Sequence, residues 1–79
     1  MYYVYVIKNV DTQKLYVGYT NNLRQRIKRH QLDKSVNLIY YEAYTHKKEA
    51  LDREIKLKMY GSAWRGLKQR LKLSLRNTA

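Results

Sequence analysis

The sequence contains no cysteine, and in a chain of 79 residues this absence restricts the possible folds more than any other feature. A chain this short buries only a little over half of the surface that its unfolded form exposes, so its hydrophobic core is thin. Neither a disulfide framework nor a zinc site with thiolate ligands can support that core. Packing must stabilise the fold alone, and the nine tyrosines help because each ring buries a large apolar area while its hydroxyl group can face water.

The composition indicates one folded domain. Hydrophobic residues make up 44% of the sequence, which is too large a share for a disordered chain. The sequence has no internal repeat, no low-complexity tract and no stretch that resembles a linker. We therefore expect a single compact domain over residues 1–79.

Three runs of β-branched and aromatic residues predict three strands. The first two, residues 2–7 and 15–19, are separated by a polar stretch at 8–14, which predicts an antiparallel hairpin. Gly18 in the second run indicates a bulge or a close approach of the backbone. The third strand is predicted at residues 38–44.

Three further segments carry apolar residues at helical spacing. Residues 20–22 are of capping types and predict a first helix that ends near Leu32, and a second helix is predicted at 47–59. A third helix is predicted at 63–75, after the break at Gly61. The order predicts an α/β fold in which a small three-stranded antiparallel-type sheet is flanked by three helices (β-β-α-β-α-α). In the second helix, the narrow apolar stripe expected to pack on the sheet consists of Leu51, Ile55 and Met59.

The charge of the chain indicates its partner. Seventeen Lys and Arg residues against six Asp and Glu residues give a net charge of +11, so we expect a polyanion to bind. Nucleic acid is the first candidate, since neutralised phosphates release counterions, and an anionic membrane is the second. Neither a run of transmembrane length nor a signal-peptide pattern is present, which predicts a cytoplasmic protein that does not enter a membrane. The residues predicted to bind nucleic acid are Arg24, Lys28 and Arg29, together with Lys68, Arg70 and Lys72, which we expect beside the candidate functional residues described next.

Arg26 and His30 occupy helical positions that could serve packing or chemistry. With Leu23 and Ile27 they follow the spacing that normally faces a core. Either the two polar residues flank the apolar stripe in solvent, or they present a guanidinium group for phosphate oxygens and an imidazole for proton transfer on one face.

Glu54, Tyr5 and Tyr16 also have two interpretations each. Glu54 lies on the inner half of the second helix, either as the i,i+4 partner of Lys58 or as a hard oxygen ligand for a divalent metal ion. Each tyrosine alone is expected to be a packing residue of its strand. Their combination with an arginine and a histidine on the next helix and a glutamate on the second helix favours a functional site.

These positions resemble, in order and spacing, the motifs of the GIY-YIG nuclease superfamily and of its short stand-alone members in particular. The first motif corresponds to Tyr3-Val4-Tyr5 and the second to Tyr16-Val17-Gly18, followed by Arg26, His30 and Glu54. Tyr3 stands where the superfamily has glycine, and Val4 and Val17 where it has isoleucine. The late asparagine that many members carry has no counterpart before Asn77.

The resemblance implies a metal-dependent endonuclease that hydrolyses phosphodiester bonds in DNA. Tyr5 or Tyr16 would position or deprotonate the attacking water, Arg26 would stabilise the transition state, and His30 would assist through the water or a tyrosine hydroxyl group. Glu54 would hold Mg²⁺ or Mn²⁺. The resemblance thus implies a catalytic set of Tyr5, Tyr16, Arg26, His30 and Glu54.

A chain this small cannot read a long DNA sequence, so we expect selection by DNA structure. Branched, nicked or damaged DNA would be the substrate, as in repair or recombination, and a protein partner could recruit the domain. The alternative is a catalytically silent nucleic-acid-binding module with the same fold. A third interpretation takes residues 64–75 as a basic amphipathic helix on a membrane surface.

Overall fold

The hairpin at the N-terminus forms as the sequence predicts. In the computed structural model, which describes residues 1–77 and the side chains of residues 1–75, β1 (Tyr2–Asn9) and β2 (Leu15–Thr20) are antiparallel neighbours. Tyr5 lies opposite Gly18 in an unbroken register. Asn9 stabilises the turn, because its Oδ1 accepts hydrogen bonds from the backbone N–H groups two and three residues later.

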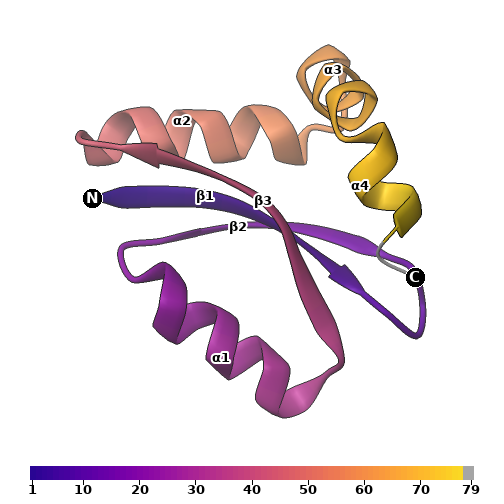
Figure 1. Cartoon of the computed structure of the whole chain (residues 1–79). Coiled ribbons are helices and arrows are strands. Elements are labelled where there is room, and N and C mark those ends of the chain that lie inside the picture. The colour runs from indigo at the N-terminus through magenta and orange to yellow at the C-terminus, as the bar shows by residue number, and fades with distance from the viewer. Residues whose placement is uncertain (78–79) are drawn as a thin grey trace.

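β3 (Val36–Tyr44) completes the sheet. It is antiparallel to β1, so the strand order is β2-β1-β3 and β1 is central (Figure 1). The strand begins two residues before its predicted start because Val36 is buried against Tyr5 and Ile7. The pairing of β1 with β3 is irregular between Val6 and Ile7.

Helices cover both faces of the sheet. α1 (Leu23–Asp33) lies on one face, and α2 (Lys47–Lys58) and α3 (Ser62–Arg70) lie on the other (Figure 1). Asn22 caps α1, since its side chain accepts a hydrogen bond of 3.1 Å from the backbone N–H of Gln25. The predicted α/β class and three-stranded antiparallel sheet are confirmed.

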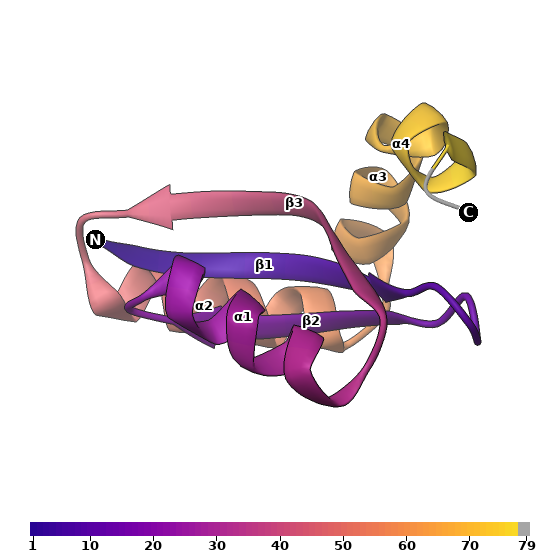
Figure 2. The ribbon, with the colours of Figure 1, turned by 60° about the horizontal axis from the view of Figure 1, so that its bottom comes forward.

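The last predicted helix, residues 63–75, is divided in the structure. α3 ends at Arg70, and α4 (Lys72–Asn77) follows Leu71, whose backbone has φ −97° and ψ 15°. The bend brings the carbonyl oxygen of Leu75 within 2.8 Å of Lys8 Nζ, and a periodic pattern cannot reveal such a tertiary hydrogen bond. Figure 2 shows α3 and α4 at the end of the sheet where the hairpin turns, away from α1.

Alternation along β1 divides the hydrophobic core into two layers. The layer on the side of α2 and α3 consists of Val4, Val6, Val17, Ala50, Leu57, Trp64 and Leu67. The layer on the side of α1 is smaller and consists of Tyr5, Ile7 and Val36, with Leu23 and Ile27 packed against them.

The apolar stripe predicted for α2 is wrong. Ile55 and Met59 are 58% and 74% exposed, whereas Ala50 and Leu57 are fully buried. Arg53 lies on that inner side and donates hydrogen bonds to a carboxylate on β3. The side of α2 that faces the sheet therefore makes a charged contact in addition to its apolar contacts. The spacing of apolar residues within one helix could not show this charged contact.

Candidate active site

β1, β2 and α1 surround a pocket of about 200 Å³. Tyr5 and Tyr16 reach it from the two strands of the hairpin, and His30 reaches it from α1. The tyrosines share a face of the sheet because Tyr16 pairs with Ile7, two residues along β1 from Tyr5. The structure thus brings three of the five residues predicted to be catalytic into one pocket.

Tyr5 and His30 are hydrogen-bonded to each other. The phenol oxygen of Tyr5 lies 3.0 Å from His30 Nε2, and the two rings meet edge to face with centroids 5.8 Å apart. Tyr5 is only 3% exposed, so the core layer around it fixes its ring. The pair is a rigid feature of the pocket wall.

Gly18 allows the Tyr5 ring to occupy this position. A methyl group added at Gly18 would overlap Cζ and the phenol oxygen of Tyr5, its partner across the hairpin. Of the two predictions for this glycine, the close approach is confirmed, and the approaching group is the Tyr5 side chain.

The local environment keeps both partners of the hydrogen bond neutral. Burial raises the pKa of the Tyr5 phenol above its ordinary value of 10.0, although the charge of Arg26 and a hydrogen bond from it act in the opposite direction. Burial, followed by the positive charges of Arg26 and Lys34, lowers the pKa of the His30 imidazole below 6.5. At neutral pH the pocket therefore holds a protonated phenol beside an uncharged imidazole.

Arg26 lies one turn of α1 before His30. Its exposed side chain borders, together with Arg29, a neighbouring pocket of about 70 Å³. Arg26 does not line the pocket of Tyr5, Tyr16 and His30. Its guanidinium group acts on the Tyr5 phenol through its charge and a hydrogen bond, both of which lower the pKa of Tyr5.

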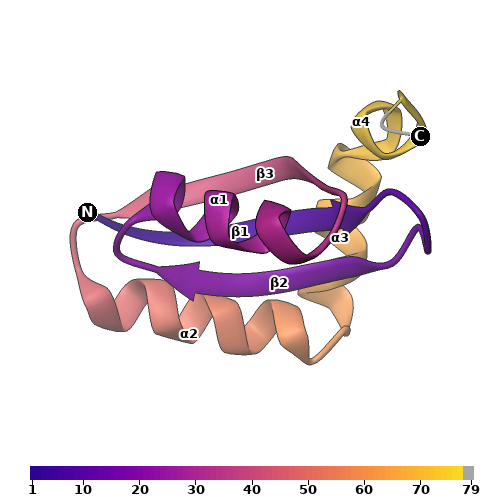
Figure 3. The ribbon, with the colours of Figure 1, turned by 90° about the horizontal axis from the view of Figure 1, so that it is seen from below.

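Glu54 approaches from the other side of the sheet. α2 packs along β2, the edge strand, as Figure 3 shows. The carboxylate forms an ion pair of 3.2 Å with Lys58, and the Glu54 side chain is 17% exposed. Its negative charge raises the pKa of Tyr5 and the charge of Lys58 lowers it, so the pair acts electrostatically on the pocket.

The donors for a metal ion are few. Among residues 1–75, no group of three or more His, Cys, Asp or Glu side chains could hold a metal ion. Glu54 forms an i,i+4 ion pair with Lys58, as the first of its two interpretations from the sequence expects. A single carboxylate in basic surroundings fits a hydrated Mg²⁺ that takes most of its ligands from water and substrate, and it does not fit a closed protein site.

Lys34 borders the pocket and was not among the predicted residues. Its Nζ lies 5.4 Å from the centroid of the Tyr16 ring, a cation–π contact at the pocket rim. α1 ends at Asp33 and Lys34 is its extended C-cap, so helical spacing could not have placed Lys34 beside Tyr16.

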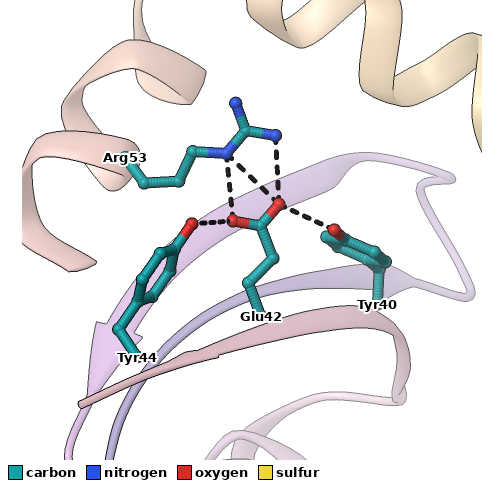
Figure 4. A network of polar contacts seen from close by, with 4 residues as sticks. All are labelled: Tyr40, Glu42, Tyr44 and Arg53. Carbon is teal, nitrogen blue, oxygen red and sulfur yellow. Dashed lines mark hydrogen bonds and ion pairs between the residues drawn. The ribbon is translucent and has the colours of Figure 1, made fainter. Parts of the chain in front are cut away.

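A second polar cluster on the opposite face was also missed. Figure 4 shows the carboxylate of Glu42 on β3 between two tyrosines of the same strand and Arg53 of α2. The Tyr40 hydroxyl group donates to Glu42 at 2.7 Å, the Tyr44 hydroxyl group donates to the other oxygen, and Arg53 donates through Nε and Nη2 at 3.0 Å. Alternation on β3 puts Tyr40, Glu42 and Tyr44 on one face, which the sequence could have shown.

The surroundings of Glu42 favour its ionised form. Burial favours the protonated carboxyl group, but hydrogen bonds from Arg53, Tyr44 and Tyr40 outweigh it and lower the pKa of Glu42 below 4.5. Burial and the hydrogen bond to Glu42 raise the pKa of Tyr44 to about 12. We call Tyr40, Glu42, Tyr44 and Arg53 the Glu42 cluster. Both carboxylate oxygens of Glu42 accept hydrogen bonds within it, which indicates a structural role.

The predicted nucleic-acid-binding residues fall on two separate surfaces. Arg24, Lys28 and Arg29 are exposed on α1, beside the pockets of Tyr5 and Arg26. The basic residues of the last helices are exposed as well, but they lie on the side of the sheet that α2 covers (Figure 1). The structure therefore does not put Lys68, Arg70 and Lys72 beside the Tyr5 pocket, because the apolar side of α3 packs on that opposite face.

The interpretation of residues 64–75 as a membrane-surface helix conflicts with the packing of α3. Trp64 and Leu67 are 7% and 2% exposed, since they belong to the larger core layer and do not face lipid. None of the helices in residues 1–77 combines the length and the apolar character that crossing a membrane requires. Asn77, the only asparagine after residue 37, ends α4, and its side chain lies outside the described residues.

Comparison with known proteins identifies the family of the chain. Residues 1–70 match the family model described as the GIY-YIG catalytic domain. A UPF0213 protein of Clostridium perfringens is 40% identical over 67 residues, which covers 73% of this chain and 71% of that protein. A UPF0213 protein of Staphylococcus haemolyticus is 37% identical over 68 residues, covering 75% and 82%, and one of Oceanobacillus iheyensis is 33% identical over 66 residues, covering 72% and 76%. No solved structure matches the chain. The family match over most of the chain and the similarity to these small relatives show that the chain belongs to the GIY-YIG nuclease superfamily.

Proposed function

We propose that this protein is a metal-dependent endonuclease that hydrolyses phosphodiester bonds in DNA. One observation carries the proposal: the buried Tyr5 phenol is hydrogen-bonded to a neutral His30 imidazole at the wall of a pocket, with Arg26 on the same helix as His30. Phosphodiester hydrolysis needs a water molecule made nucleophilic and a positive charge near the non-bridging oxygens. These residue types supply both.

Tyr5 and His30 would form the proton-transfer part of the site. When Nδ1 of the neutral imidazole carries the ring proton, Nε2 accepts the proton of the Tyr5 hydroxyl group. A phenol whose pKa is raised is a poor base by itself. We therefore infer that the phenol oxygen of Tyr5 accepts the proton of the attacking water, while the proton of the Tyr5 hydroxyl group passes to His30 Nε2.

Tyr16 and Arg26 would act on the water and on the phosphate. Tyr16 is 40% exposed at the pocket, so its hydroxyl group can reach solvent and orient the attacking water. The Arg26 guanidinium group has donors that match phosphate oxygens and can stabilise the charge that develops on them. Its exposure beside the Tyr5 pocket leaves it accessible to a DNA strand.

Glu54 is the residue that would hold the divalent ion. Mg²⁺ typically takes one or two carboxylates and completes its coordination with water and substrate phosphate, and Mn²⁺ suits the same oxygen ligands. A bound ion supplies a Lewis acid for the phosphate oxygens. Glu54 must exchange its Lys58 partner for that ion, so we expect weak metal binding before DNA contributes its own oxygens.

The substrate in this proposal is DNA selected by structure. The exposed basic residues of α1 lie beside the candidate site and can contact phosphates on either side of the cleaved bond. Branched, nicked or damaged DNA in repair or recombination is the proposed target, with recruitment by a protein partner. A cytoplasmic location belongs to the same proposal.

Replacing Glu54 by glutamine tests the role of the metal ligand. Glu54→Gln removes the charge that would hold the ion and keeps the side-chain size, so cleavage with Mg²⁺ or Mn²⁺ should fall by about a hundredfold or more. Glu49→Gln is the matched control, because Glu49 is an exposed glutamate in the first turn of the same helix. Cleavage of branched, nicked and linear DNA is measured beside DNA binding, which should change little in either variant.

One outcome would contradict the role of Glu54, and another would contradict the endonuclease. Equal cleavage by the Glu54→Gln variant would exclude Glu54 as the metal ligand. Binding of DNA without cleavage by the unaltered protein, in Mg²⁺ and in Mn²⁺, would favour the silent nucleic-acid-binding module.

A further inference from the structure

A third pocket, larger than that of Tyr5, lies on the same face of the sheet, between α1 and β3. It has a volume of about 540 Å³, which is in the range of ligand pockets. Tyr3 of β1 and Tyr41 of β3 form one wall, and residues of α1 form the other. We call it the α1–β3 pocket, and no step of the proposed hydrolysis uses it.

Aromatic rings in this pocket are arranged to accept another ring. Tyr3 and Tyr41 meet edge to face with centroids 6.1 Å apart, and Tyr41 is 52% exposed on an edge strand. An exposed tyrosine ring that a neighbouring ring holds in place is a suitable platform for a nucleobase. Leu23, Ile27 and Leu38 make the rest of the wall apolar.

The charge of the pocket suits a strand with phosphates. Arg24 and Lys28 are the charged residues in its lining, both exposed and one helical turn apart on α1. Two cations beside an aromatic platform fit a nucleotide, whose base stacks while its phosphates bind the cations. A neutral or cationic ligand would not use them.

The α1–β3 pocket adjoins the smaller pocket of Arg26. Asn21 and Asn22 border both this pocket and the smaller pocket of Arg26. Tyr3 is two residues from Tyr5 on the same face of β1, a separation of roughly 7 Å. A DNA strand with its cleaved phosphate at Tyr5 and Arg26 would therefore bring a neighbouring nucleotide to the α1–β3 pocket.

We propose that the α1–β3 pocket binds an unpaired base of the DNA substrate, stacked on Tyr41 with its flanking phosphates at Arg24 and Lys28. A base inside a duplex is stacked between its neighbours and cannot reach Tyr41. The inference rests on the proposed function for the choice of DNA, and it names the substrate class. That class is DNA with an unpaired base next to the cleaved bond, as in a flap, a loop or a single-stranded end.

A fluorescent base analogue tests the pocket without cleavage. The probe is a DNA hairpin with a single-stranded extension that carries one 2-aminopurine, whose fluorescence falls on stacking, and EDTA prevents hydrolysis. Tyr41→Ala should weaken binding of this probe by about tenfold and abolish the fall in fluorescence, whereas Tyr41→Trp should preserve both. Binding of a blunt duplex should be equal in all three proteins.

Tyr60→Ala is the matched control variant. Tyr60 is 55% exposed and also packs edge to face on an aromatic ring, that of Trp64 on the opposite side of the sheet. The loss of an exposed tyrosine is the same in both variants, so an equal loss of probe binding in Tyr60→Ala would overturn the assignment to the α1–β3 pocket. Circular dichroism establishes that each variant is folded.

Removing the base itself provides a second measurement. A probe with an abasic position in place of 2-aminopurine should bind the unaltered protein about tenfold more weakly, and Tyr41→Ala should then cause no further loss. Additive losses would refute stacking on Tyr41. Quenching by Tyr41 in a protein that cleaves no DNA would reject the proposed endonuclease and keep the pocket, whereas cleavage without quenching would reject the pocket alone.

Discussion

The two faces of the sheet each carry a cluster of tyrosines with a basic side chain, and the two clusters differ in how completely they are hydrogen-bonded. In the Glu42 cluster, two phenols and a guanidinium group occupy both oxygens of the carboxylate (Figure 4). On the other face, Tyr5 and His30 bond to each other at the wall of a pocket of about 200 Å³.

The difference shows why residue type does not identify a catalytic group. Burial is the largest cause of the raised pKa of both phenols, Tyr44 and Tyr5, but the hydrogen bond to Glu42 raises the pKa of Tyr44 further, whereas Arg26 opposes the shift of Tyr5. The Glu42 carboxylate is strongly held in its ionised form, which stabilises the contact of α2 with β3. Tyr5 instead faces a partner that can take up a proton, next to space for a substrate.

Removing one phenol oxygen from each cluster should have opposite consequences. Tyr5→Phe should lower the rate of DNA cleavage by about 10²–10⁴-fold, because it breaks the proton transfer to His30. Its cost in folding stability should be only about 0.5–1.5 kcal/mol, the value of a hydrogen bond between neutral groups. Cleavage kinetics and thermal unfolding measure the two effects.

Tyr44→Phe is the matched change in the Glu42 cluster. It removes a hydrogen bond to a charged acceptor and should cost about 1.5 kcal/mol, which lowers Tm by roughly 6–12 °C for a domain of this size. Cleavage should stay near that of the unaltered protein. If Tyr44→Phe lost more cleavage than Tyr5→Phe, the assignment of the two clusters would be reversed.

Gly18→Ala should disturb the Tyr5 pocket without changing any of its polar groups. The added methyl group overlaps the Tyr5 ring, so the ring must move away from His30 at a cost of about 1–3 kcal/mol. Gly66→Ala is the control, because nothing lies within 4 Å of a methyl group at this exposed position in α3. There the same substitution should stabilise the protein by up to about 1 kcal/mol, since alanine favours a helix.

Denaturant unfolding of the two glycine variants makes this comparison direct. A destabilised Gly18→Ala variant that still cleaves DNA at the normal rate would contradict the need for the Tyr5–His30 contact. Equal stability of Gly18→Ala and the unaltered protein would show that the ring has room to shift.

The sequence could predict the sheet and the composition of the candidate site. Alternation and pairing put Tyr5 and Tyr16 on one face, and the helical spacing put Arg26 and His30 together on α1. It could not predict which face α2 buries, because Arg53 finds its partner on β3, eleven residues earlier in the chain. The bend at Leu71 escaped prediction for the same reason, since the accompanying hydrogen bond joins Lys8 to Leu75.

The smallest expected effect is a pH dependence of stability that separates the clusters. His30 has a lowered pKa in the folded protein, so the unfolded chain binds the proton more readily, and stability falls as pH decreases from about 6.5 towards the folded pKa. Glu42 has a lowered pKa as well, and its contribution is present above about 4.5 and lost as pH falls through the lower folded pKa. Thermal unfolding between pH 8 and pH 3, in unaltered protein and in His30→Gln and Glu42→Gln variants, resolves the two ranges.

Each variant should remove the decline that belongs to its own residue. His30→Gln should flatten only the range just below pH 6.5, and the change should be small because solvent screens a partly exposed imidazole. Glu42→Gln should lower stability at neutral pH and flatten only the acidic range, because it loses the ionised acceptor of the cluster. A decline just below pH 6.5 that persists in His30→Gln would mean that another group titrates there. The decline would then not report the protonation of His30, and the pH dependence would give no support to a neutral imidazole beside Tyr5.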